Sequence, residues 1–302
     1  MGERGSGTEP DLPSGVAVDF GGTKIAASRV LAGRVCDPVR AVTDGAAGPV
    51  EQVEAICDLV NRLTLQPDDR VGVAVAGRVD ASGTWHALNT ETLSRVQAVP
   101  LRDLLSERLD RAVTVQNDAT AAAVGEHIAG AGRGVARFGY LTVSTGVGGG
   151  IVLDGQPVTS PSGLAGHVGF TTSRMSAGRC GSGRVATVEN IAGGRAIAAG
   201  AAELGHIGWD AKRVFEAHLA GESWARDLIT ASARAVAELL ANLKAILDLD
   251  RVAIGGSIGL APGYLSLVNA ALTDEPEIFR PEIMPAQLGH AASLIGILTD
   301  LA

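Results

Sequence analysis

The sequence predicts an α/β fold built from two similar halves. Strand-like apolar runs alternate with helix-like segments along the chain. Two strands end in glycine-rich turns and resume as a second strand: residues 19–24 read Asp-Phe-Gly-Gly-Thr-Lys, and residues 144–150 read Ser-Thr-Gly-Val-Gly-Gly-Gly. A third strand end between them carries Asn117-Asp118. Two equivalent glycine turns can face each other across a cleft and hold the phosphates of one nucleotide from both sides.

The first half is expected to alternate strands and helices. Apolar residues recur at helical spacing over 50–63, and 70–76 is a short apolar run typical of a buried strand. The predicted order is strands at 16–18, 25–30 and 33–36, a helix at 50–63, a strand at 70–76, a helix at 100–109, a strand at 113–115 and an alanine-rich helix ending near Ala129.

The second half repeats the strand, glycine turn and strand. Residues 159–183 show no periodicity and are rich in Gly, Ser and Thr, so a long irregular loop is expected, and such loops are usually functional. The predicted elements are strands at 138–144 and 151–153 with a turn at Asp154-Gly155, helices at 188–204 and 223–247, a strand at 251–254, a helix at 263–272, a β segment near Ile283 and a last helix at 289–301.

Length, charge and cysteine content exclude several classes of protein. The 302 residues suffice for two domains or one large α/β domain. A net charge of −8 without a basic cluster argues against nucleic-acid binding. The three cysteines form no Cys-x-x-Cys pair, so a reducing cytoplasm fits better than a disulfide framework. No apolar run reaches the roughly 18 residues of a membrane span. Residues 1–14 are polar and are expected to be a disordered tail.

The first glycine turn has the composition of a phosphate site. Gly21 and Gly22 let backbone N–H groups approach an anion, and Thr23 and Lys24 add a hydroxyl and a positive charge. Asp19 at the strand end could hold Mg²⁺, directly or through water. The alternative for this stretch alone is an ordinary hairpin turn. Neither a P-loop nor a dinucleotide fingerprint occurs elsewhere, which disfavours P-loop NTPases and dehydrogenases.

Two interpretations apply to Asn117-Asp118. An aspartate before a helix is a common N-cap. Alternatively, Asp118 is a general base that accepts a proton from an attacking hydroxyl, and Asn117 orients that substrate. The glycine turns on both sides of this pair favour the catalytic interpretation.

Together these motifs, with Gly255-Gly256-Ser257, resemble those of the ROK family (repressors, open reading frames and sugar kinases) of the sugar-kinase/Hsp70/actin superfamily. The resemblance runs from about Val16 to Ala302. It implies a two-lobed actin-like ATPase (ribonuclease H-like) fold with a central interlobe cleft. The small lobe would comprise residues 15–117 with the C-terminal helix 289–302 packed back on it, and the large lobe residues 118–288.

The resemblance also implies an activity: an ATP- and Mg²⁺-dependent kinase acting on the 6-hydroxyl of a hexose or amino-hexose such as glucose, N-acetylmannosamine or kanosamine. It further implies a homodimer in the cytoplasm, with Asp118 as the base. The sugar-binding positions would be Gly77, Asn89, Asn117, Asp118, His167 and Glu189. The ATP-binding positions would be Gly21, Gly22, Thr23, Lys24, Thr145, Gly146, Gly148, Gly255 and Gly256.

The chain departs from the family pattern at its zinc motif. The family carries Gly-Glu-x-Gly-His and Cys-x-Cys-Gly-x-x-Gly-Cys-x-Glu, whose histidine and three cysteines bind a structural zinc. Here Phe170, Ser182 and Thr187 occupy three of the four ligand positions, and only Cys180 remains. A structural zinc needs four N or S ligands, so no zinc is expected.

The sugar-binding motif also differs, because His167 replaces the family's glutamate and an imidazole can donate or accept a hydrogen bond. Together with Phe170, this change predicts a substrate preference unlike that of typical glucokinases. A sugar-sensing or catalytically silent relative is the alternative. The intact Asp118 and glycine turns favour a kinase, and regulators of the family carry an N-terminal helix-turn-helix for which residues 1–14 are too short.

Overall fold

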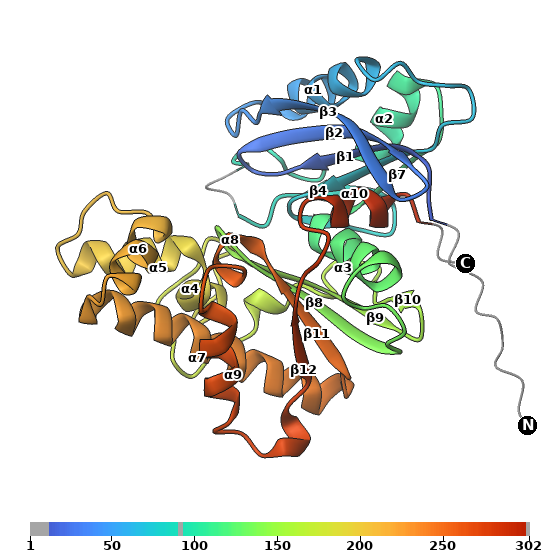
Figure 1. Cartoon of the computed structure of the whole chain (residues 1–302). Helices are drawn as coiled ribbons and strands as arrows, with labels where there is room; N and C mark the ends of the chain where they lie inside the picture. Colours follow the sequence, from blue (N-terminus) through green and yellow to red (C-terminus); the bar gives the residue numbers. More distant parts are fainter. Residues whose placement is uncertain (1–11, 90–92, 300–302) are drawn as a thin grey trace, which may run out of the picture.

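The computed structural model describes residues 12–89 and 93–299 and contains two five-stranded sheets (Figure 1). The first sheet has the order β3-β2-β1-β4-β7. In it, β1 pairs antiparallel with β2 and parallel with β4, and β4 pairs parallel with β7. Its strands are β1 (Gly15–Phe20), β2 (Lys24–Leu31), β3 (Arg34–Val42), β4 (Val71–Val75) and β7 (Val113–Asn117).

The second sheet, β10-β9-β8-β11-β12, repeats this arrangement. Strand β8 pairs antiparallel with β9 and parallel with β11, which pairs parallel with β12. The prediction of two similar halves is therefore confirmed, and each glycine turn joins the first two strands of its sheet. The strands are β8 (Arg137–Val143), β9 (Val147–Leu153), β10 (Gln156–Pro157), β11 (Arg251–Gly255) and β12 (Glu282–Pro285).

Alternate residues of β1 serve two different cores. Val16 and Val18 pack with α1 (Pro49–Asn61) and α2 (Leu101–Leu109) on the outer face of the first sheet. Ala17 faces the opposite way and packs against α10 (Ala291–Ile297). This alternation is the consequence of the two-residue period of a strand.

Two helices fill the space between the sheets, as Figure 1 shows. Helix α3 (Asp118–Ala129) packs against β8 and β9, and α10 packs between α3 and the first sheet. The chain therefore leaves the second sheet after β12 and returns to the first. Because α3 starts directly after β7, its first turn lies at the junction of the two halves.

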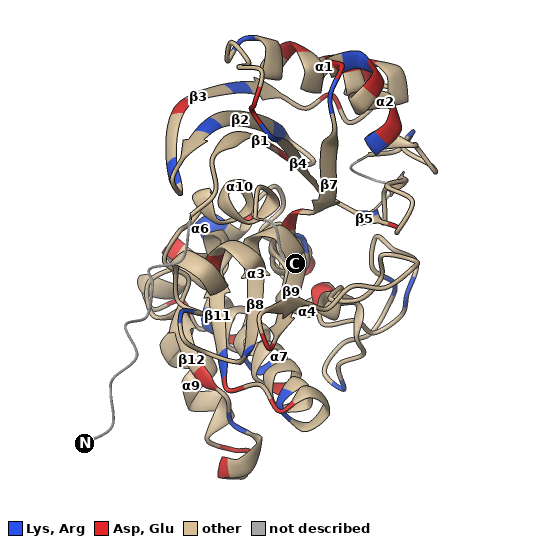
Figure 2. Cartoon of the chain, turned by 90° about the vertical axis from the view of Figure 1, so that its right-hand side faces the viewer, with Lys and Arg blue, Asp and Glu red and all other residues tan. Residues whose placement is uncertain are grey.

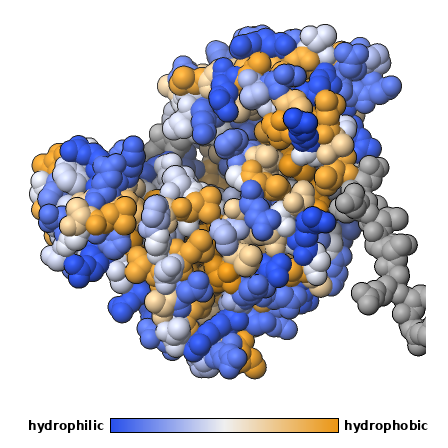
Figure 3. Space-filling model, in the orientation of Figure 1, coloured by the Kyte–Doolittle hydropathy of each residue, from blue (hydrophilic) through white to orange (hydrophobic). Residues whose placement is uncertain are grey.

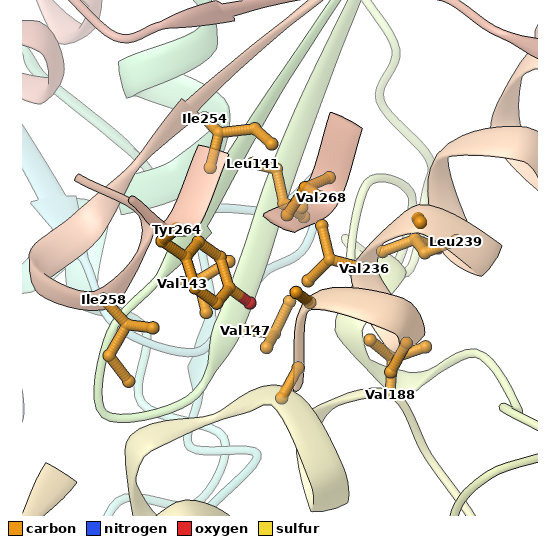
Figure 4. Close-up of a cluster of buried hydrophobic side chains, with 14 of the residues drawn as sticks. Leu141, Val143, Val147, Val188, Val236, Leu239, Ile254, Ile258, Tyr264 and Val268 are labelled. Carbon is orange, nitrogen blue, oxygen red and sulfur yellow. The ribbon is translucent and has the colours of Figure 1, made fainter. Parts of the chain in front are cut away.

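The other face of the second sheet is covered by a helical layer. Leu141 and Val143 of β8 pack with Val236 of α7 (Ser223–Leu247) and Val268 of α9 (Tyr264–Leu272), as Figure 4 shows. The remaining elements are the hairpin β5 (Arg78–Val79) and β6 (Trp85–His86), helices α4 (Glu189–Ala192), α5 (Gly194–Glu203), α6 (Ala211–Leu219) and α8 (Gly256–Gly259), and the 3-10 turns η1 (Val168–Phe170) and η2 (Glu277–Phe279).

Most predicted elements are present, with several differences in extent. The helix predicted at 188–204 is two helices, because the chain is extended at Gly193 and the N–H of Gly194 bonds the carbonyl of Ser144 at 2.7 Å instead. The strand predicted at 151–153 begins at Val147, so it includes three glycines that the sequence placed in the turn. The strand predicted at 33–36 extends to Val42.

Several short elements were not predicted: α6, α8, the β5–β6 hairpin, β10 and the two 3-10 turns. The last helix spans Ala291–Ile297 rather than 289–301, and residues 300–302 lie outside the described part of the chain. Most of the predicted tail, residues 1–11, lies outside it too.

Charged and apolar residues are both distributed over the surface. Acidic and basic residues are interspersed on α2, whereas the charged residues of α1 are all acidic (Figure 2). Hydrophobic and hydrophilic side chains intermingle on the face shown in Figure 3. None of the helices within residues 12–89 and 93–299 has the length and hydropathy needed to cross a bilayer.

Candidate active site

A cavity of about 590 Å³ is lined by residues of both halves, near the carboxyl ends of β1, β4, β7 and β8. Ligands of α/β proteins commonly bind at such strand ends. Both glycine turns and the Asn-Asp pair contribute to its wall. The predicted site residues that line it are Asp19, Gly21, Gly22, Thr23, Lys24, Gly77, Asn89, Asn117, Asp118, Thr145, Gly146, Gly148, His167 and Glu189.

Gly255 and Gly256 do not belong to the described residues that line this cavity. Gly255 is the last residue of β11, where it pairs with Thr142 of β8, and Gly256 is the first residue of α8. The next residue, Ser257, places its Oγ 3.1 Å from the Oγ of Ser144 in the second glycine turn. The predicted nucleotide residues of β11 therefore adjoin the second turn without facing the cavity.

Asp118 is the first residue of α3, and its N-cap is Asn117. The Asn117 Oδ1 accepts the backbone N–H of Thr120 at 2.9 Å. Asp118 Oδ1 accepts the N–H of Ala119 at 2.8 Å and the side-chain amide of Asn117 at 2.9 Å. The capping role that the sequence left open for Asp118 thus falls to its neighbour, and Asp118 lines the cavity.

The amide of Asn117 is fully engaged inside the protein. Its Nδ2 donates to the carbonyl of Gly77 at 2.8 Å as well as to Asp118, which uses both of its N–H groups. Asn117 is 9% exposed. It therefore fixes the orientation of the Asp118 carboxylate and ties it to the loop after β4.

Two carboxylates share this end of the cavity. Burial, and secondly the negative charge of Asp19, raise the pKa of Asp118 to about 7. Burial also raises the pKa of Asp19, while the Ser293 hydroxyl, Lys24 and His290 oppose that shift. A carboxyl with a pKa near neutrality is suited to exchange a proton during a reaction.

His167 and Glu189 also line the cavity. The Nδ1 of His167 lies 3.2 Å from the carbonyl of Leu164, and its ring stacks on Phe170 with centroids 6.2 Å apart. Burial lowers the pKa of His167, which favours the neutral imidazole. Glu189 Oε2 accepts the N–H of Val147 at 3.1 Å, so this side chain connects the start of α4 to the second glycine turn.

Several residues at or near the cavity were not among the site residues predicted from the sequence. Ser293 and His290 come from the C-terminal helix and its N-cap, which the fold returns to Asp19. Arg179 and Arg195 line the cavity and, like Lys24, carry positive charge. The sequence held one sign of Arg195, since it directly follows Gly193-Gly194. In the structure its N–H donates to the carbonyl of Thr145 at 3.1 Å.

The residues present fit Mg²⁺ and do not fit zinc. Asp19 supplies the oxygen ligand that Mg²⁺ prefers, next to a turn suited to phosphate. At the family's zinc positions, the Sγ of Cys180 lies 3.0 Å from the Oγ of Ser182, and Thr187 is fully buried. Across residues 12–89 and 93–299, no group of three or more His, Cys, Asp or Glu side chains could hold a metal ion.

The family model and the similar sequences identify the same family of proteins. The model of the ROK family matches residues 15–300. The N-acetylmannosamine kinase of Escherichia coli O139:H28 is 40% identical over 282 residues, which are 93% of this chain and 96% of that protein.

Solved structures of the same family superpose along nearly the whole chain. The ROK hexokinase of Thermus thermophilus has a TM-score of 0.82 and 31% identity, covering 94% of this chain and 96% of the other. The ROK family glucokinase of Streptomyces griseus, solved with glucose and AMPPNP, has a TM-score of 0.81 and 29% identity, covering 94% and 98%. The actin-like fold predicted from the sequence is thereby confirmed.

Proposed function

The chain belongs to the ROK family and is a sugar kinase, and we propose that it transfers the γ-phosphoryl group of ATP to the 6-hydroxyl of N-acetylmannosamine. The observation that carries this proposal is the placement of Asp118. Its carboxyl, with a pKa of about 7, lines the same cavity as both glycine turns.

In the proposed reaction the ionised carboxylate of Asp118 accepts the proton of the sugar 6-hydroxyl. The hydroxyl oxygen attacks the γ-phosphorus, the bond from that phosphorus to the β,γ-bridging oxygen breaks, and ADP leaves. Asn117 holds the carboxylate in its orientation. Backbone N–H groups of both turns and the ammonium of Lys24 bind the phosphates, because phosphoryl transfer depends mainly on positioning and on stabilising charge.

Asp19 would hold the Mg²⁺ ion, directly or through water, and Ser293 and Lys24 favour its ionised form against the opposing effect of burial. Bound there, Mg²⁺ supplies charge neutralisation for the phosphates.

We choose N-acetylmannosamine over glucose and kanosamine as the proposed substrate because an N-acetylmannosamine kinase is 40% identical to this chain. The neutral imidazole of His167 can pair with a hydroxyl or an acetamido group, whereas a carboxylate can only accept. A catalytically silent sugar sensor remains the second candidate, since Phe170 and His167 alter the sugar side of the cavity.

The packing of the C-terminal helix supports a division of the chain into two lobes. We propose a small lobe of residues 15–117 completed by the C-terminal helix, which packs on Ala17 and Ala74 of the first sheet, and a large lobe of residues 118–288. A cytoplasmic homodimer is proposed from the family resemblance.

A coupled assay of ADP release tests the function. Glucose, N-acetylmannosamine, N-acetylglucosamine and kanosamine are each supplied with ATP and Mg²⁺, and the product is identified by ³¹P NMR. Fastest turnover with N-acetylmannosamine, giving a 6-phosphate, supports the proposal. Sugar binding without turnover on any of the four supports the sensor instead.

The pH dependence of kcat/KM for the sugar follows from the pKa of Asp118 in the free enzyme. A base must be deprotonated, so kcat/KM is expected to fall about tenfold per pH unit below a pKa near 7 and to level off above it. Removing the charge of Asp19 lowers the pKa of Asp118, so Asp19→Asn is expected to move the acid limb to lower pH while also lowering kcat. An acid limb that stays in place in this variant contradicts the coupling of the two carboxyls.

A further inference from the structure

The segment 171–188 forms a loop between η1 and α4, which we call the site loop. It contributes Arg179, Cys180 and Gly181 to the cavity wall and leads directly into Glu189. Gly181 approaches the other half of the protein so closely that a Cβ there would lie 2.5 Å from the Nδ2 of Asn89. The position of the site loop therefore sets the shape of the sugar side of the cavity.

The two ends of the site loop are paired with each other. Thr172 forms a β-bridge with Thr187, and the N–H of Ser173 donates to the carbonyl of Ala186 at 2.9 Å. This neck closes the loop but does not fix its position relative to the rest of the molecule. A contact outside the loop is needed for that.

Asn190 of α4 provides one such contact, donating its Nδ2 to the carbonyl of Ala177 at 2.6 Å, and helix α7 provides another through Glu238. Between Ala235 and Ala241 every residue of the helix except Glu238 is buried, so its carboxylate stands in an otherwise apolar stretch. Its side chain is 15% exposed. A charge so placed is costly unless it is hydrogen-bonded, and here the partners come from the site loop.

Both oxygens of Glu238 bind the neck of the site loop. Oε2 accepts the hydroxyl of Ser173 at 2.6 Å, and Oε1 accepts the N–H of Arg174 at 3.3 Å. The Arg174 guanidinium lies 3.5 Å from Oε1, and the Ser173 hydroxyl itself accepts the N–H of Met175 at 3.2 Å. Hydrogen bonds to an ionised acceptor are the stronger kind.

The same helix also holds the far end of this segment. Ser232 of α7 donates its hydroxyl at 3.0 Å to the carbonyl of Ala192, the last residue of α4. Val236 of α7 lies in the same apolar cluster as Val188, as the close-up in Figure 4 shows. Glu189 lies between these two anchors, so α7 determines where its carboxylate meets the second glycine turn.

We propose that Glu238 is a positioning residue that holds the site loop on α7 without a metal ion and thereby sets the affinity for the sugar. The effect on sugar affinity rests on the proposed function, whereas the anchoring of the loop does not depend on it. It accounts for how the loop keeps its place although the residues at the zinc positions do not fit zinc.

Limited trypsin digestion of the whole protein tests the anchor directly, because the site loop carries the exposed residues Arg174, Arg179 and Arg184. Glu238→Gln is expected to be cleaved in the loop about tenfold faster than the unchanged protein, since a charge-assisted hydrogen bond is replaced by a neutral one. Asp227→Asn, at an exposed position of the same helix, is the matched control and is expected to leave the rate unchanged.

Ser173→Ala removes the same bond from the loop side and leaves the core of α7 intact, so it is expected to reproduce the faster cleavage even if Glu238→Gln loses stability. The double variant should be cleaved no faster than the faster single variant. In kinetics, both single variants should raise the KM for sugar several-fold with nearly unchanged kcat and KM for ATP. A merely structural role would lower all of these together.

Cleavage of both single variants at the unchanged rate would overturn the anchor. Faster cleavage of the unchanged protein after treatment with EDTA or 1,10-phenanthroline would overturn it too, since a metal would then hold the loop. Faster cleavage of the variants, in a protein that phosphorylates no sugar, would support the anchor and overturn the proposed function.

Discussion

Asp118→Asn is expected to lower kcat by about 10²–10⁴-fold without loss of stability. Asparagine can accept the same hydrogen bonds from Ala119 and Asn117, so the first turn of α3 should keep its geometry. What disappears is the group that takes the proton. Burial and Asp19 raise the folded-state pKa of this carboxyl, which means that its ionised form opposes folding above pH 7. The variant should therefore unfold at an equal or higher temperature at pH 8.

Steady-state rates with saturating sugar and ATP measure the first effect, and thermal unfolding at pH 8 measures the second. Asp154→Asn, in the exposed turn after β9, is a matched control because asparagine tolerates the left-handed backbone that Asp154 adopts. It should behave like the unchanged protein. If Asp118→Asn kept more than about a tenth of kcat, a different residue would have to act as the base.

Gly296→Ala is expected to cost about 1–3 kcal/mol of unfolding free energy or more. Gly296 lies where α10 crosses α3, and a Cβ there would stand 1.8 Å from the carbonyl oxygen of Ala121 and 2.7 Å from the N of Gly125. Both are backbone atoms, which cannot move aside as a side chain can. The two helices must separate, and α3 carries Asp118 at its start, so activity should fall along with stability.

Gly200→Ala in α5 is the control for this prediction. A Cβ at Gly200 would meet only the Cδ2 of Leu228, the end of a flexible side chain, at 2.7 Å. Alanine is favoured over glycine inside a helix by about 0.5–1 kcal/mol, so this variant should be neutral or slightly stabilised. Urea denaturation of both variants gives the comparison. Equal stability of Gly296→Ala and the unchanged protein would mean that α3 and α10 do not cross as described.

The chemistry of the cavity could be predicted where it lies in short contiguous motifs. The first motif is a strand end followed by paired glycines, Thr23 and Lys24, and these residues suffice to predict a phosphate site. The second is Asn117-Asp118, which lies where a predicted strand meets a predicted helix. Such local patterns can be predicted because the conformation of a strand end, a turn or a helix start is determined by a few neighbouring residues. The structure brings these motifs to one cavity.

What the sequence did not predict depends on contacts between distant segments. The hydroxyl of Ser293 reaches Asp19 only because α10 returns to the first sheet after the whole second half has been completed. The break at Gly193 arises from a hydrogen bond to Ser144, about fifty residues earlier. Glu238 looks in the sequence like an ordinary polar position of a long helix, and only its neighbours in space reveal the loop that it holds.

The most direct test of the proposed mechanism is a crystal structure with N-acetylmannosamine and a non-hydrolysable ATP analogue. The mechanism predicts the sugar O6 within hydrogen-bond reach, about 2.6–3.2 Å, of an Asp118 carboxylate oxygen, with the γ-phosphorus beyond it and the phosphates between the turns at 21–24 and 144–149. A sugar whose 6-hydroxyl lies away from Asp118, or phosphates that contact only one of the two turns, would contradict it.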